Sequence, residues 1–195
     1  LSIRWEIYPV PHEGKRALHG GSRMEEGDWW TREHRPDRLM EARFMLAEMI
    51  FIKALFEHNR KLWYRSFPFH FGLYILVGFL VLLLARTAVV LAGGAPPAAL
   101  DAVAVAVGVV GFVLTLAGTV GLIAMRLTDP DMRPYTSPSH HFNLILFLVA
   151  LGTLFAGWIA AGLTVAPFGR FLEALLTFDL TAGVGSPVVA AGMLM

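Results

Sequence analysis

Long apolar stretches separated by short polar segments dominate the last two thirds of the chain. The first runs from Phe67 to Ala92 as FPFHFGLYILVGFLVLLLARTAVVLA. At 1.5 Å per residue, a helix over residues 69–91 covers about 30 Å, the hydrocarbon thickness of a bilayer. Comparable stretches predict further spans over about 101–125 and 142–165, and a fourth that starts near 184. The pattern therefore predicts an all-α membrane protein, a transmembrane helical bundle over residues 67–195.

The preceding segments have a different pattern. Residues 1–37 are rich in Gly, Pro, His and charged residues, which indicates an irregular segment outside the membrane. Residues 38–66 mix apolar and charged positions in a way that is typical of an amphipathic helix. We expect this helix to lie flat in the membrane interface, with Trp63, Tyr64 and Arg65 as an interfacial anchor and a helix entry at Pro68. The segment TVAPFGRFLEALLTFDLTAG is expected to form a partly amphipathic loop or short helix.

Composition supports a membrane protein and excludes several classes of function. Hydrophobic residues make up 56% of the chain, and its mean hydropathy is +0.60. A net charge of +1 argues against a nucleic-acid partner. There is no cysteine, so this chain holds no disulfide and no thiolate-bound iron–sulfur cluster or zinc. The chain opens without Met and closes at the start of an apolar segment, so we expect both ends to be cut.

The distribution of Lys and Arg predicts the orientation. Twelve of the sixteen precede the first span, two lie in the loop from Arg126 to His141, and Arg170 alone lies on the opposite side. Because cytoplasmic loops carry the excess of cations, the amino-terminal segment and the Arg126–His141 loop are expected in the cytoplasm. The helix over 38–66 would then be a cytoplasmic amphipathic helix.

Two ionisable residues lie inside the first span. Arg86 has a long side chain that can reach the far boundary, and a plain anchoring role is expected for it. His70 is short, and an ionisable group inside a span is by default a candidate functional residue. From the residue alone, a haem or metal ligand and an interfacial histidine bonded to a backbone carbonyl remain open.

Further candidates accompany His70. A b-type haem in a helix bundle needs imidazole ligands and small residues beside the macrocycle. Gly72, Gly118 and Gly121 could provide such haem packing, although tight helix–helix packing explains glycines equally well. His140 and His141, at the mouth of the third span and beside Asp129, Asp131 and Tyr135, could instead serve quinone or proton traffic, or be ordinary loop histidines.

The run FPFHFGLYILVGFL, from Phe67 to Leu80, resembles the histidine-bearing helix of the gamma subunit of respiratory nitrate reductase. The chain also resembles related cytochrome b subunits of sulfite-reduction-associated and heterodisulfide-reductase-like complexes. In that family His-Phe-Gly is followed ten residues later by a second His, and the two bind two haems in opposite halves of the bilayer. The first position matches His70. The second is Leu80, which implies that only the cytoplasm-proximal haem is kept.

The resemblance implies a membrane anchor in the prokaryotic cytoplasmic membrane. It would carry one haem b, use menaquinone or ubiquinone, and pass electrons between the quinone pool and a cytoplasmic iron–sulfur or molybdenum subunit. The second haem ligand would lie beyond Met195, and a further helix would precede Leu1. The partner subunit would dock on the amphipathic helix from Arg38 to Tyr64.

Two alternatives belong to other classes. A haem-free structural anchor for a peripheral redox enzyme would be consistent with the missing ligand at Leu80. A small transporter or channel is disfavoured, because the second and third spans contain almost no polar side chains near their centres.

Overall fold

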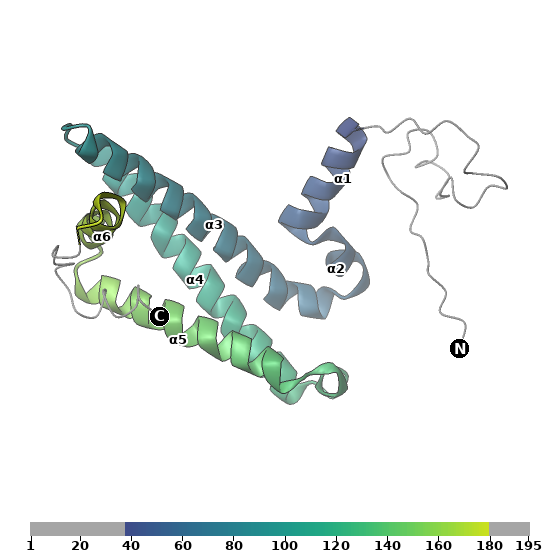
Figure 1. Cartoon of the computed structure of the whole chain (residues 1–195). Coiled ribbons are helices and arrows are strands. Elements are labelled where there is room, and N and C mark those ends of the chain that lie inside the picture. Colours follow the sequence, from purple (N-terminus) through teal and green to yellow (C-terminus); the bar gives the residue numbers. More distant parts are fainter. Residues whose placement is uncertain (1–37, 180–195) are drawn as a thin grey trace. The chain divides into compact units, whose positions relative to one another are not determined.

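The computed structural model describes residues 38–179 (Figure 1). The irregular segment expected over 1–37 and the fourth span expected from 184 lie outside the described residues. The chain divides into two units, one ending at His58 and one beginning at Asn59. Each unit is described by itself.

The first unit contains two short helices, α1 (Arg38–Phe51) and α2 (Lys53–His58). The sequence pattern favours one continuous helix over 38–66, but the described part of this unit is broken at Ile52, whose φ is 49°. A β-branched residue is strained at positive φ, and neither Gly nor Pro marks this position. The break therefore could not be read from local sequence signals.

The second unit contains three long helices, α3 (Arg60–Leu91), α4 (Ala98–Thr128) and α5 (Pro138–Ala160). Each is long and apolar enough to cross a membrane. A 3₁₀ turn, η4 (Arg133–Tyr135), and a twelve-residue helix, α6 (Ala166–Thr177), complete the described elements. The prediction of an all-helical membrane protein is thus confirmed, and residues 38–179 contain no strand.

The first span starts earlier than the apolar pattern indicates. Asn59 is its N-cap, and the side-chain oxygen of Asn59 accepts a hydrogen bond from the Leu62 N–H at 3.0 Å. Pro68 lies inside α3 and not at its start. Residues 60–66, which the sequence pattern assigns to the amphipathic helix, thus continue into the span.

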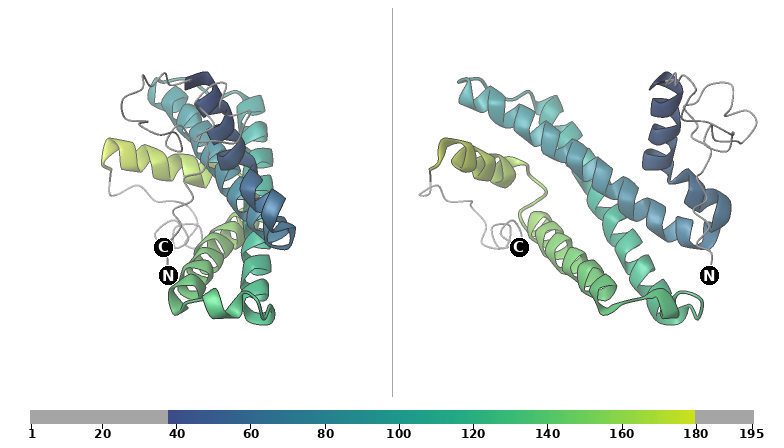
Figure 2. Two further views of the ribbon diagram at one scale, coloured as in Figure 1. Left: turned by 90° about the vertical axis from the view of Figure 1, so that its right-hand side faces the viewer. Right: turned by 45° about the vertical axis from the view of Figure 1, so that its right-hand side comes forward.

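Helices α3 and α4 form the most extensive contact among the described elements, while α5 packs on α4 and α6 on α3. The two views of Figure 2 show α3 and α4 crossing one another. The hydroxyls of Thr115 and Thr119, both fully buried, donate to carbonyls one turn earlier in α4, at 2.8 and 2.7 Å. The buried threonine hydroxyls of α4 are therefore satisfied within that helix, whereas the buried hydroxyl of Thr87 in α3 has no hydrogen-bond partner among the described residues.

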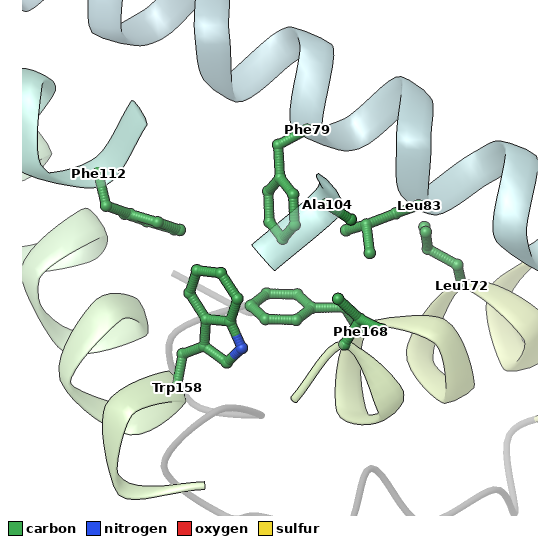
Figure 3. Close-up of a cluster of buried hydrophobic side chains, with 8 residues drawn as sticks. Phe79, Leu83, Ala104, Phe112, Trp158, Phe168 and Leu172 are labelled. Atoms are coloured by element: carbon green, nitrogen blue, oxygen red, sulfur yellow. The ribbon is translucent and has the colours of Figure 1, made fainter. Parts of the chain in front are cut away.

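Two buried apolar clusters lie at different levels of the second unit. The smaller joins Phe69, Leu122 and Leu144 from α3, α4 and α5. The larger gathers around Trp158, which is fully buried and lies against rings from α3, α4 and α6 (Figure 3). We call these levels the His70 end and the Arg86 end of the bundle, after the ionisable residue of α3 nearest to each.

Candidate functional site

His70 is held by its own helix. Its Nδ1 lies 2.8 Å from the carbonyl oxygen of Ser66, four residues earlier, and 3.2 Å from the Ser66 hydroxyl. A ring nitrogen beside a carbonyl carries the proton, so Nδ1–H donates and Nε2 retains its lone pair. This arrangement is the one that orients an imidazole as a metal ligand. The same hydrogen bond is expected of a structural histidine that is bonded to a backbone carbonyl. The bond alone therefore does not distinguish a metal ligand from a structural histidine.

Aromatic rings border this imidazole. The ring of Phe69 meets it edge-on, with centroids 5.1 Å apart and planes at 87°. Phe69 is buried and makes a second edge contact, with Phe147 of α5, at 5.4 Å. His70 itself is half-buried. Its surroundings are thus apolar on the Phe69 side.

The glycines beside His70 serve the contact between α3 and α4. A Cβ on Gly118 would lie 2.3 Å from the Phe69 nitrogen, and one on Gly72 would lie 2.5 Å from the Thr115 nitrogen. Such distances are shorter than real atoms tolerate, so only glycine permits this approach of the backbones. Gly121 faces the side chain of Arg65. Helix packing accounts for these positions, and haem packing against Gly72, Gly118 and Gly121 stays a prediction.

The two histidines at the start of α5 differ in their surroundings. His140 completes the N-terminal cap, since its Nδ1 accepts a hydrogen bond from the Ser137 N–H at 3.1 Å. His141 is half-buried, and its Nε2 is buried without a hydrogen-bond partner. His140 is therefore part of the helix cap, whereas His141 has an unused nitrogen. The quinone or proton role of both stays a prediction.

Asp129 is already engaged. Asp129 is only 5% exposed. Its carboxylate lies 2.5 Å from Lys61 Nζ and accepts a hydrogen bond from the Asp131 N–H at 2.9 Å. The hydrogen bond from Lys61, with that from Asp131, holds the pKa of Asp129 below its usual value. The carboxylate thus joins the ends of α3 and α4, and it is poorly suited to accept a proton for the neighbouring histidines.

The level of Leu80 has a different character. Leu80 borders a cavity of about 280 Å³ whose lining side chains are all Leu and Phe, from α3, α4, α5 and α6. Trp158 lies next to this cavity, its ring so close to Gly108 that a Cβ there would approach within 2.7 Å. The indole N–H donates to the Thr164 carbonyl at 2.9 Å. No lining side chain of this cavity can ligate a metal.

Arg86 is paired with acids, contrary to the plain anchoring role expected for it. Its Nε lies 3.1 Å from Asp101 Oδ1 of α4, and its NH1 lies 3.6 Å from Glu173 Oε1 of α6. Its side chain is 14% exposed. The guanidinium therefore links three helices, and nothing local in the sequence indicates this because its partners are 15 and 87 positions away.

Sequence reasoning missed two residues at the His70 end. Ser66 orients the imidazole, and the spacing of four between Ser66 and His70 on a predicted helix could have indicated it. Arg126, near the end of α4, has a buried Nε without a partner, which no sequence signal indicates. Within residues 38–179, no three His, Asp or Glu side chains lie close enough to hold a metal ion. The second haem ligand expected beyond Met195 lies outside the described residues.

Comparison with protein-family models gave a match over most of the described residues. The family model for the nitrate reductase gamma subunit matches residues 53–183, about two thirds of the chain. This range includes α3, α4, α5 and α6, and thus His70, His140 and His141. The comparisons with curated proteins and with solved structures found no significant match.

Proposed function

The chain belongs to the nitrate reductase gamma subunit family, and on that premise we propose that it binds one haem b through His70 and transfers electrons between the quinone pool and a cytoplasmic redox subunit. Membership in this family and the three apolar helices indicate a membrane-anchored electron-transfer subunit. The haem, the quinone and the partner are the finer part of the proposal.

The haem proposal is carried by the family match over the segment that contains His70, taken together with the hydrogen bond between His70 Nδ1 and the Ser66 carbonyl. This bond leaves Nε2 with a lone pair and fixes the plane of the ring, which are the two properties that an axial ligand needs. Phe69 and Phe147 provide an apolar wall at this level. A low dielectric around the iron tunes its potential, and a haem b bound here would supply one-electron transfer.

The Leu80 level supports a count of one haem. Leu80 replaces the second histidine of the family motif, and the cavity beside it contains only apolar side chains. The neighbouring interior is filled by packed rings around Trp158. These residues offer no ligand to a second haem in that half of the bundle.

The orientation and the partner are proposed from charge. With fourteen Lys and Arg on one side and one on the other, the His70 end faces the cytoplasm. The iron–sulfur or molybdenum subunit would then dock on the charged surface of residues 38–58. Quinone, either menaquinone or ubiquinone, would exchange electrons with the haem from the membrane.

Substitution of His70 tests the proposal. The full chain with His70→Ala should insert into membranes as before but lose the b-type band from its reduced-minus-oxidised spectrum. His140→Ala is the matched control, since it changes an exposed capping histidine and should keep the band. Haem retained at the wild-type level in His70→Ala would remove His70 from the site.

The alternative is a haem-free structural anchor for a peripheral redox enzyme. It is distinguished by the same spectrum recorded on the wild-type protein. A partner subunit that copurifies with a chain lacking any b-type band would establish the anchor and overturn the electron-transfer role.

A further inference from the structure

Two buried nitrogens without hydrogen-bond partners lie at the His70 end. They are Nε of Arg126, near the end of α4, and Nε2 of His141, at the start of α5. In the described part of the chain, the only other such side-chain atom is the hydroxyl of Thr87. Arg126 Nε–H is a donor, and His141 Nε2 is a donor in the tautomer that carries the proton there. A buried donor without an acceptor is unfavourable by about 1–3 kcal/mol, and more when it is charged. The two nitrogens therefore mark a place where an acceptor from outside the described residues would be stabilising.

The two nitrogens lie at the same end of two adjacent helices. Leu122 of α4 and Leu144 of α5 are part of the same buried cluster. Arg126 follows Leu122 by four residues, and His141 precedes Leu144 by three. Because α4 and α5 are consecutive helices that run in opposite directions from their shared loop (Figure 1), these steps lead along both helices toward the same end. Arg126 and His141 thus lie at one level, beside the loop.

The charge at this site is positive and uncompensated. Arg126 makes no ion pair with a described residue, and the nearby Asp129 is engaged by Lys61. Arg65 lies against Gly121, one to two turns before Arg126 in α4. The amino-terminal end of α5 adds the positive end of its dipole. An anion with several acceptor oxygens, such as a phosphate group, satisfies these donors best.

The surroundings select a lipid as the source of that phosphate. Exposed apolar side chains flank the two nitrogens, namely Leu127 at 59%, Phe142 at 65% and Ile145 at 50% exposure. The site lies at the end of two spans, where headgroups meet hydrocarbon. A phospholipid brings its phosphate to this level while its acyl chains cover the apolar side chains, which free phosphate would leave in water.

We propose that Arg126 and His141 bind the phosphate of an anionic phospholipid. This site is separate from the haem ligand His70. The lipid phosphate would bind the same His141 nitrogen that a quinone would bind. The lipid and the quinone therefore exclude one another at His141.

Native mass spectrometry of the full chain, purified in detergent and supplied with phosphatidylglycerol, tests the site. The wild-type protein should retain one tightly held lipid, and R126Q should lower the bound fraction about tenfold, as expected for loss of a charged hydrogen bond. H141Q should lower it as well and serves as a second variant if R126Q does not fold. R133Q is the matched control, because Arg133 is exposed in the same loop, and it should bind as the wild type does.

The competing occupants have distinct results. Equal retention by R126Q and R133Q would overturn the proposal, as would a wild-type protein that retains no phosphatidylglycerol. Displacement by inorganic phosphate would show a free-anion site, and displacement by a menaquinone analogue would show a quinone site. Either displacement would overturn the lipid assignment. The b-type spectrum of R126Q should be unchanged, which separates this test from that of the haem.

Discussion

The two ends of helix α3 are similarly apolar but pack differently against the neighbouring helices. At the His70 end, the interior is narrow, because glycine allows the α3 and α4 backbones to touch, and an oriented imidazole stands at its edge. At the Arg86 end, the buried rings around Trp158 pack together with apolar side chains of α6. One end presents an oriented imidazole, and the other end presents packed rings and the ion pairs of Arg86 with Asp101 and Glu173.

The contrast between the two ends shows how one helix can hold a candidate ligand in the half near His70 and none in the half near Leu80. A histidine at the position of Leu80 would face a cavity lined by Leu and Phe, with no imidazole opposite it among the lining residues. Leu80 thus lies in a region that is lined by apolar side chains from every described α-helix of the second unit. Substitutions at either end of α3 test whether the two ends are independent.

The largest effect on stability is expected from Trp158→Ala. Trp158 is fully buried and contacts Phe79 and Phe168, with ring centroids 5.3 and 5.4 Å apart. The cavity left behind should lower the free energy of unfolding by about 3–5 kcal/mol, measured by denaturant titration in detergent. Ile159→Ala, at a 53% exposed neighbour, should change it far less. If Trp158→Ala also abolished haem binding while the chain remained folded, the two ends would not be independent.

The next effect tests the His70 end. In Gly118→Ala, the new methyl group would meet the Phe69 backbone, which cannot move without separating the helices. We expect a loss of about 1–3 kcal/mol in the free energy of unfolding. Gly78→Ala is the matched control, because nothing lies within 4 Å of a Cβ there and alanine favours the helix. Equal stability of the two variants would contradict the close approach of the backbones.

These two positions also show where sequence reasoning reaches its limit. Hydropathy predicts three spans and a fourth from about residue 184, and three helices long and apolar enough to cross a membrane are found in residues 38–179. They could be predicted because length and apolarity are properties of each segment alone; the fourth lies outside the described residues. The role of a glycine depends on what lies opposite it, so Gly78 and Gly118 look alike in the sequence and differ in the structure. The pairing of Arg86 with Glu173 depends in the same way on the fold.

His70 is the candidate that the sequence reveals best. A histidine near the edge of an apolar span is conspicuous in the sequence, whereas the lack of a partner at Arg126 is visible only once its neighbours are known. The break of the amphipathic region at Ile52 is a third case, since its positive φ comes without Gly or Asn.

An effect no larger than that of Gly118→Ala is expected at the Arg86 end from Arg86→Ala. The substitution leaves Asp101 and Glu173 without their cation, and both carboxylates are only partly exposed, at 36% and 27%. Because solvent screens them in part, we expect a loss of about 1–3 kcal/mol in the free energy of unfolding. Arg170→Ala, on the exposed face of α6, is the control and should have little effect. Equal losses from both substitutions would show that the three-helix linkage by Arg86 does not stabilise the Arg86 end.

The smallest effect concerns pH at the His70 end. The pKa of Asp129 is lowered in the folded chain by the hydrogen bond from Lys61, whereas an aspartate in the unfolded chain has a pKa of about 3.9. A lowered pKa means that the unfolded state takes up protons first, so the stabilisation is complete above about pH 5 and is lost as the pH falls through the folded pKa.

The melting temperature of Asp129→Asn should therefore lie below that of the wild type between about pH 5 and 7, and the difference should vanish in acid. Asp131→Asn is the control, because Asp131 is an exposed neighbour, and its melting temperature should follow that of the wild type at every pH. The effect is small because the Lys61 side chain is 62% exposed. A difference between Asp129→Asn and the wild type that persisted unchanged below about pH 3 would mean that the amide disturbs packing, and that the charge of Asp129 does not hold the ends of α3 and α4 together.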